Sequence, residues 1–210
     1  MNKISFTLLC LISLSACTPK ANQENFTKGM NDYLAKRGDL CLAKNNWPID
    51  VSAEDVAIGT RNALQMPVLQ KLGLVSATTL IVENKIDKKV VKNPLIRYQL
   101  TEQGKKYYLM RESSSTAADG SKIEHQGDLC VAKLSLDKVV KWEPASNVGA
   151  NKQMVVSYTY SIVPAPWLQN ADAKRVFPMV DRVVQGAHVA QLQETFVLMP
   201  DGWVAKELIK

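Results

Sequence analysis

The side chains that offer the most chemistry in this 210-residue chain are its cysteines, its two histidines and two aspartates that recur in the same context. His125 and His188 have no second histidine or cysteine at the spacing of metal ligands, so we expect surface histidines, no metal site and no cofactor. The sequence also contains no nucleophile-elbow, phosphate-loop or His-Glu-x-x-His pattern. We therefore predict a protein that is not an enzyme.

One heptapeptide occurs twice and carries a cysteine and an aspartate each time. Residues 38–44 read GDLCLAK, and residues 127–133 read GDLCVAK. Because the flanking sequences differ, we interpret the copies as one local structure used twice, with a strand entrance at each cysteine; coincidence is the alternative. Asp39 and Asp128 would form a carboxylate pair, the basis of an acid–base enzyme, if the two copies met. Aspartates beside glycine more often shape turns or cap helices, and we favour that role.

The N-terminus has the pattern of an export signal. Residues 1–3 carry a positive charge, residues 4–14 are apolar, and small residues precede Cys17. The apolar run is about half the ~20 residues that a membrane-spanning helix needs, so we expect residues 1–16 to be cleaved. Leu14-Ser15-Ala16-Cys17 resembles the lipobox of bacterial lipoproteins, which implies that Cys17 becomes a lipid-bearing N-terminus. Ordinary secretion, with Cys17 as a free thiol or a disulfide partner, is the alternative.

The lipoprotein resemblance also implies a location. In such lipoproteins an aspartate after the cysteine often signals retention in the inner membrane, and this chain has Thr18 instead. We therefore expect an anchor in the outer membrane, facing the periplasm, with the membrane as the first partner. Cys10 leaves with the signal and Cys17 carries lipid, so Cys41 and Cys130 remain in an oxidising compartment, where we expect them to form a structural disulfide.

Periodicity predicts an N-terminal half rich in helices. We expect a helix over residues 24–36, a second helix capped by Ser52 and Asp55, a short third helix from Pro67 closed by Gly73, and a fourth opening at Thr101. Two further predictions complete this half: an apolar face on the second helix made by Val56, Ala63 and Leu64, and a β-hairpin of residues 78–82 and 90–100.

Residues 52–110 resemble a winged helix-turn-helix domain. The resemblance rests on Leu72-Gly73-Leu74-Val75 before the hairpin and on YQLTEQGKK at residues 98–106 after it. It implies DNA contact through the wing and the third helix, and residues 67–111 hold nine basic against three acidic side chains. Because an exported chain does not meet the chromosome, we expect no nucleic-acid partner. The hairpin is then either simply solvated or an anionic-surface contact made by Lys85, Lys88, Lys89 and Lys92.

The C-terminal half reads as an antiparallel sheet with one helix. Residues 154–163 alternate as a strand, residues 129–141, 190–199 and 203–208 supply further strands, and residues 167–185 predict a helix that Pro178 kinks or begins. The four tryptophans are expected to fill core corners, although they would also suit a ligand groove between the halves; they are Trp47, Trp142, Trp167 and Trp203.

Composition and pattern together predict an α+β protein with a winged-helix-like N-terminal half. The 46% hydrophobic and 22% charged content excludes disorder, and the net charge is +6. The expected divisions are a signal peptide at 1–16, a tether at 17–27, a winged-helix-like domain at 28–112, a connector at 113–126 and an α+β domain at 127–210. We expect a lipid-anchored accessory protein, without catalysis, that binds another envelope protein or an anionic polymer. An enzyme that uses acidic residues on an envelope polymer is the alternative.

Overall fold

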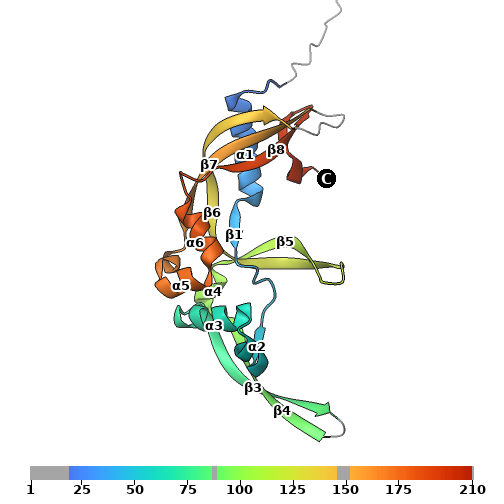
Figure 1. The fold of residues 1–210 in the computed structure, drawn as a ribbon, viewed down its shortest axis with the longest axis vertical. Coiled ribbons are helices and arrows are strands. Elements are labelled where there is room, and N and C mark those ends of the chain that lie inside the picture. The colour runs from blue at the N-terminus through green and yellow to red at the C-terminus, as the bar shows by residue number, and fades with distance from the viewer. Residues whose placement is uncertain (1–18, 87–88, 146–151, 210) are drawn as a thin grey trace, which may run out of the picture.

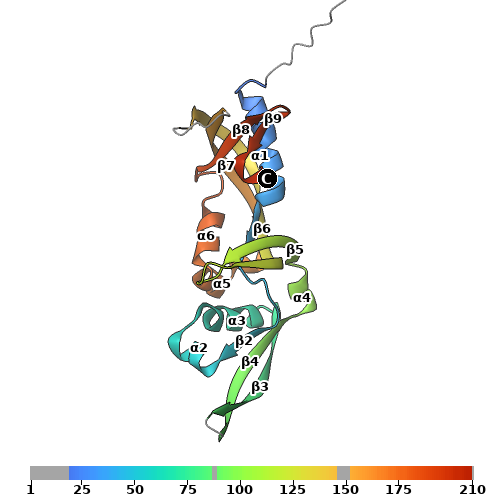
Figure 2. The ribbon, with the colours of Figure 1, turned by 90° about the vertical axis from the view of Figure 1, so that its right-hand side faces the viewer.

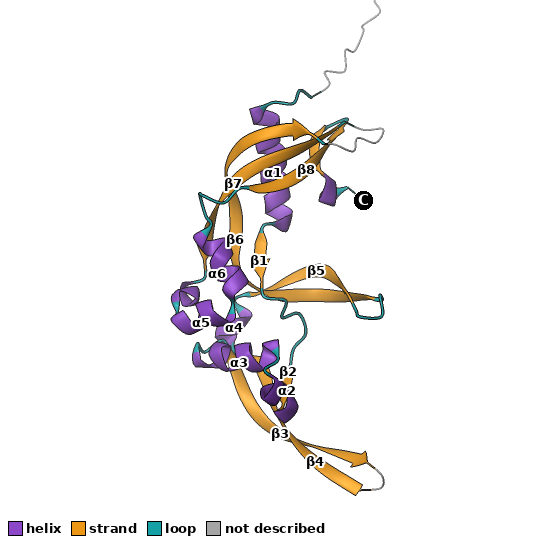
Figure 3. Ribbon diagram, viewed as in Figure 1, coloured by secondary structure: helices purple, strands orange, loops and turns teal. Residues whose placement is uncertain are grey.

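The computed structural model describes residues 19–86, 89–145 and 152–209 and has an α+β fold. Its described strands form two antiparallel sheets, one of six strands and one of three, and its helices are short apart from the first and third (Figure 3). The α+β prediction is confirmed, and the larger sheet exceeds the one predicted for the C-terminal half.

The helices are α1 (Gln23–Arg37), α2 (Ala53–Ile58), α3 (Arg61–Lys71), α4 (Glu102–Lys105), α5 (Ala171–Val176) and α6 (Pro178–Gln185), with 3₁₀ turns η1 (Pro166–Gln169) and η2 (Lys206–Leu208). The strands are β1 (Asp39–Cys41), β2 (Ile49–Ser52), β3 (Val75–Ile86), β4 (Lys89–Leu100), β5 (Tyr108–Thr116), β6 (Lys122–Pro144), β7 (Gln153–Pro164), β8 (Leu192–Met199) and β9 (Gly202–Ala205). The large sheet has the order β1-β6-β7-β8-β9, with β5 paired to the other part of β6, and the small sheet has the order β2-β4-β3.

The fold begins earlier than the predicted tether allows. The Asn22 side chain caps α1 by accepting from the Asn25 backbone at 2.9 Å. The carbonyl of Lys20 accepts from Trp203 Nε1 at 3.2 Å and from Asn25 Nδ2 at 2.9 Å, so this residue is already held against the C-terminal strands. Residues 23–27 are helical and are not a tether.

The helix α1 belongs to the large sheet. Its buried side chains Phe26, Met30 and Leu34 pack with residues of β6, β7, β8 and β9 in one hydrophobic core. The predicted helix over 24–36 is therefore correct in extent. Its partner, however, is the C-terminal sheet and not the predicted winged-helix-like half, since amphipathic periodicity shows which face of a helix is buried but not what covers it.

The second predicted helix is divided in two. The capping box of Ser52 and Asp55 is present, with the Ser52 backbone donating to Asp55 Oδ2 at 2.9 Å. Gly59, at φ +68°, then ends α2 in the left-handed conformation, and α3 begins at Arg61. This break resets the helical phase, which explains why the predicted apolar face is wrong: Val56 and Leu64 are 59% and 58% exposed.

The predicted hairpin is present and longer than expected. β3 and β4 pair from Val75↔Leu100 to Ile86↔Lys89, and β2 pairs with the other edge of β4. Pro67 lies inside α3 rather than at the start of a third helix. The helix predicted from Thr101 is limited to α4, and Tyr108 already belongs to β5.

The predicted connector at 113–126 is also a hairpin. β5 and β6 pair from Tyr108↔Leu129 to Thr116↔Lys122. A serine- and threonine-rich strand whose side chains are mostly exposed has no apolar alternation, so its composition resembles that of a loop. The helix predicted over 167–185 is likewise broken, because Phe177 leaves the helical conformation and Pro178 begins α6.

Strand β6 joins the two hydrophobic cores. Leu129 and Val131 belong to the core that packs α3, α5 and α6 onto the small sheet, whereas Val139 belongs to the core beneath α1. The tryptophans are divided between the cores: Trp142 and Trp203 contact Phe26, and Trp167 contacts Phe177. This arrangement matches the expectation of core corners and not that of one shared groove.

The molecule is elongated. α1, β8 and β9 lie at one end of the long axis, and the β3–β4 hairpin projects at the opposite end (Figures 1 and 2). α5, α6 and the disulfide-bearing strands lie between them. None of the helices in the described part of the chain has the length and apolarity needed to span a bilayer.

Candidate functional site

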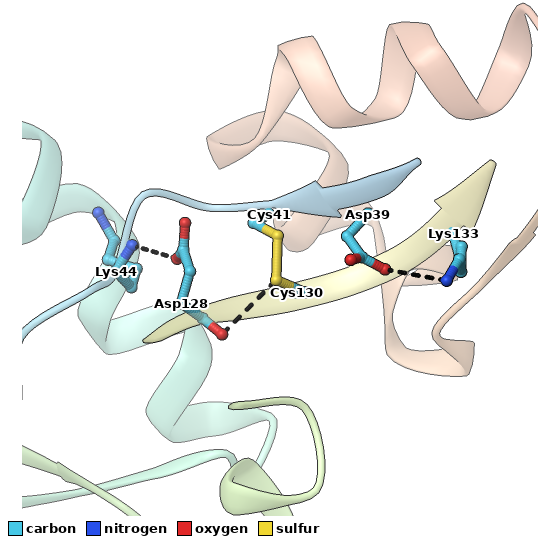
Figure 4. Close-up of a disulfide and its surroundings, with 6 residues drawn as sticks. All are labelled: Asp39, Cys41, Lys44, Asp128, Cys130 and Lys133. Atoms are coloured by element: carbon cyan, nitrogen blue, oxygen red, sulfur yellow. Dashed lines mark hydrogen bonds and ion pairs between the residues drawn. A yellow bond between two sulfur atoms is a disulfide. The ribbon is translucent and has the colours of Figure 1, made fainter. Parts of the chain in front are cut away.

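The two copies of the heptapeptide pair with each other across a cysteine pair. Cys41 and Cys130 have their sulfur atoms 2.03 Å apart, at disulfide distance. β1 runs antiparallel to β6 in the register Asp39↔Lys133, Leu40↔Ala132 and Cys41↔Cys130 (Figure 4). Each copy thus supplies one strand of the same ladder, in agreement with the interpretation of one local structure used twice.

This pairing sets the aspartate of each copy beside the lysine of the other. Asp39 Oδ1 lies 3.9 Å from Lys133 Nζ, and Asp128 Oδ1 accepts from the Lys44 backbone N–H at 2.7 Å. The two aspartates therefore lie on opposite sides of the disulfide (Figure 4). The hypothesis that they form a carboxylate pair is wrong. Because the two copies run antiparallel and pair at their cysteines, the residues that precede the cysteines lie on opposite sides of the disulfide.

Lys44 differs sharply from its counterpart Lys133 in exposure. The Lys133 side chain is 53% exposed, whereas Lys44 is only 3% exposed. The difference arises because Lys133 stays in β6, while the chain after Leu42 leaves the sheet through Ala43, whose φ of +55° lies in the left-handed region.

The buried ammonium of Lys44 has one hydrogen-bond partner among the described residues. Lys44 Nζ donates to Asn62 Oδ1 at 2.9 Å in the first turn of α3. Burial, and secondly the positive charge of Arg61, lower the pKa of Lys44 to about 8 against the opposing effect of Asp128. A buried lysine with a lowered pKa beside a hollow is a candidate functional group.

A polar hollow of about 330 Å³ lies next to this lysine. Three segments meet there: the loop after β1, the start of α3 and the β5–β6 hairpin. The lining residues are Ala43, Lys44, Asn45, Asn46, Ile49, Asn62, Ser115 and His125.

His125 is the most buried polar group of the hairpin wall. It is 8% exposed, so the prediction of a surface histidine is wrong here, and its Nε2 lies 2.8 Å from Ser115 Oγ. Its Nδ1 and the Asn45 Oδ1 are buried without a hydrogen-bond partner among the described residues. His188, in contrast, has a 62% exposed side chain and lies 3.3 Å from Asp137, so that prediction is confirmed.

A second surface lies at the end of the molecule that carries the β3–β4 hairpin. An apolar groove of about 170 Å³ runs between α2 and the small sheet, lined chiefly by Val51, Ala53, Val56, Pro94 and Ile96. Ile81, which pairs with Pro94 of the groove lining, is 66% exposed, and Ile58 at the end of α2 is 72% exposed. Large apolar side chains gathered on an exposed face are typical of interaction surfaces.

The predicted anionic-contact lysines belong to the same hairpin. Lys92 has a 66% exposed side chain 3.2 Å from Glu83. Lys85 lies on β3 and Lys89 on β4, and the structure describes their backbone but not their side chains. Lys88 and Cys17 lie outside the described residues.

A carboxylate and tyrosine cluster on the α1 side was not predicted. Burial and the neighbouring Glu207 raise the pKa of Glu194, and burial raises the pKa of Tyr158 to about 12. Tyr33 Oη lies 3.4 Å from Glu207 Oε2. Within the described ranges, no three His, Cys, Asp or Glu side chains converge as metal ligands.

Comparison of the chain with protein-family models, with curated proteins and with solved structures gives no match. The repeated heptapeptide was the one sequence signal for the hollow, since it ends at Lys44. His125 and Ser115 had no such signal, because only the strand pairing brings them to the loop after β1.

Proposed function

We propose that this chain is a lipid-anchored protein on the periplasmic face of the outer membrane that binds another envelope protein without catalysis. The lipobox resemblance at Cys17 supports the anchor, and the cysteine pair at disulfide distance agrees with an oxidising compartment. The observation that carries the binding role is the apolar groove beside the hairpin, at the end of the molecule opposite α1.

The anchor would orient the molecule. Two residues lie between Cys17 and Lys20, whose carbonyl accepts a hydrogen bond from Trp203, and the three Cα-to-Cα steps span at most about 10 Å. The end that carries α1 would therefore lie at the membrane. The β3–β4 hairpin would extend away from it, toward other components of the periplasm.

The chemistry of the hairpin end favours a protein partner. An apolar groove suits aliphatic or aromatic side chains, whereas a polysaccharide offers mainly hydroxyl groups. Lys85, Lys88, Lys89 and Lys92 give the adjoining hairpin a basic character that complements acidic residues. The proposed partner segment thus carries apolar side chains flanked by carboxylates.

We retain the winged-helix likeness of residues 52–110 as part of this proposal. Its support is the element order β2-α2-α3-β3-β4 and the sheet order β2-β4-β3. The helix α1, which packs on the large sheet, does not complete such a domain. We propose that this region serves protein docking and not nucleic-acid binding.

Site-specific photocrosslinking in intact cells tests the docking surface. A photoreactive residue at Ile81, 66% exposed beside the groove, should capture a discrete envelope protein. The same residue at Asn31, exposed on α1, is the matched control and should not capture it. Capture of the same partner only from position 31, or of no protein from position 81, would contradict the proposal.

Charge neutralisation tests the contribution of the lysines. Replacing Lys85, Lys88, Lys89 and Lys92 by glutamine should reduce capture from position 81 and should make the residual capture less sensitive to salt. A variant in which Lys28, Lys36, Lys138 and Lys174 are replaced by glutamine instead removes the same four charges elsewhere and controls for net charge. Equal losses in both variants would contradict a specific role for the hairpin lysines.

A further inference from the structure

The hollow beside the disulfide lies apart from the groove proposed for docking. We propose that this hollow binds a small oxyanion, a carboxylate or phosphate group, through the ammonium of Lys44. The inference goes beyond the proposed function, because it depends neither on the lipid anchor nor on the hairpin.

The buried cation Lys44 is incompletely paired. An ammonium has three donors, and among the described residues Lys44 Nζ makes one hydrogen bond, to Asn62. No described carboxylate lies within ion-pair distance of this ammonium. A largely buried ammonium without an ion-pair partner is costly, so a bound oxyanion would relieve part of that cost.

The surroundings of Lys44 add further positive potential. The Arg61 guanidinium is close enough to lower the pKa of Lys44, and it lines the neighbouring depression that shares Ala43 with the hollow. The first turn of the 11-residue helix α3, which contains Asn62, adds the partial positive charge of a helix N-terminus. Asp128 is the one described acidic group that acts on Lys44, and its Oδ1 accepts the Lys44 backbone N–H.

Two residues that line the hollow, His125 and Asn45, carry unpaired buried polar atoms. His125 is more than nine-tenths buried, and neither its Nδ1 nor Asn45 Oδ1 has a hydrogen-bond partner among the described residues. Buried polar atoms of native proteins are nearly always paired, so exceptions beside a hollow point to a ligand. These groups favour a ligand that bears a hydrogen-bonding group next to its oxyanion.

Titration of the full mature chain with simple oxyanions tests the inference. Inorganic phosphate and acetate, added separately at constant ionic strength and pH 7, should each be followed by isothermal calorimetry and by backbone amide shifts. We expect at least one of them to saturate a single site, with the largest shifts at residues 43–46 and 62. Phosphate alone would identify a phosphate-type ligand, and acetate alone a carboxylate-type ligand.

The repeated heptapeptide supplies a matched pair of variants. Lys44→Met should weaken binding at least about tenfold, because it removes the proposed ligand contact. Lys133→Met removes the equivalent lysine of the other copy, which is exposed, and should leave the affinity unchanged. Arg61→Gln should weaken binding less than Lys44→Met, because Arg61 acts through its field.

Two results would overturn the inference. One is the absence of saturable binding of either anion to the native chain; the other is an equal effect of Lys44→Met and Lys133→Met, which would indicate charge screening. Thermal unfolding of each variant separates a folding defect from a binding defect. Asn62→Ala removes the hydrogen-bond partner of Lys44 but keeps the charge of the lysine, so this variant should still bind the anion measurably.

Discussion

Replacing Lys44 by methionine should change how stability depends on pH. The pKa of this buried lysine is lowered to about 8 in the fold from an ordinary value of 10.5. The folded state therefore binds the proton more weakly than the unfolded state, so burial of the ammonium is penalised fully below pH 8. The penalty is relieved as the pH rises from 8 to 10.5, and stability rises with it.

The magnitude follows from the size of the shift. A difference of about 2.5 pKa units corresponds to about 3 kcal/mol at most, of which about 2.5 kcal/mol is gained by pH 10. The polar hollow beside Lys44 admits solvent, whose screening makes both figures upper values. Methionine fills a similar volume without a charge, and the variant should be at least as stable as the native chain at pH 7.

Equilibrium unfolding in urea measures this effect directly. Native protein and Lys44→Met should be compared at pH 7 and pH 10 under non-reducing conditions, with Lys133→Met as the control. We expect the native chain to gain about 2 to 3 kcal/mol relative to Lys44→Met between the two pH values. The stability that the native chain gains relative to Lys133→Met between pH 7 and pH 10 should be near zero, because Lys133 is exposed. An equal gain in Lys44→Met and the native chain would refute the burial of a charged Lys44.

Three further perturbations test other parts of the structure. Glu194→Gln should become more stable relative to the native chain as the pH rises from 4 to 7. The fold raises the pKa of Glu194 and so disfavours its charged form, which the native chain must bury at pH 7. Urea unfolding of both proteins at pH 4 and pH 7 checks this. Gly104→Ala should cost at least about 2 kcal/mol in urea unfolding, because a Cβ there would overlap the Leu74 carbonyl, whereas Gln103→Ala, at an exposed neighbour, should cost little. Replacing Cys41 and Cys130 together by alanine should cost up to about 5 kcal/mol by thermal unfolding, since their link closes an 89-residue separation.

Local sequence signals predicted several elements well. The capping box of Ser52 and Asp55, the helix over 24–36 and the hairpin of β3 and β4 all depend on residues close in sequence. The α+β class followed from these signals and from the alternating residue types in the sequence of β7, although residues 156–160 of that strand are all buried. Short-range hydrogen bonds and alternation of burial act within a few residues, and a single sequence records them directly.

Long-range packing could not be predicted in the same way. The position of α1 on the large sheet depends on contacts with strands more than a hundred residues later. The polar hairpin of β5 and β6 lacked apolar alternation, and Gly59 divided a helix whose flanking residues were individually compatible with one continuous element.

The candidate site shows the same division. The repeat at residues 38–44 and 127–133 drew attention to the cysteines, and the structure brings both copies together. It did not show that Lys44 is buried and Lys133 exposed, because that difference arises from the backbone turn at Ala43. His125 joined the site only through its place on β6 opposite Ser113, next to Ser115.

Intact mass analysis of protein purified from native membranes tests the central claim, the lipid anchor, most directly. The account predicts a chain that begins at Cys17 and carries the added mass of acyl chains on that residue. A chain that begins at Met1 with an unmodified Cys17 would contradict the anchor and the orientation built on it.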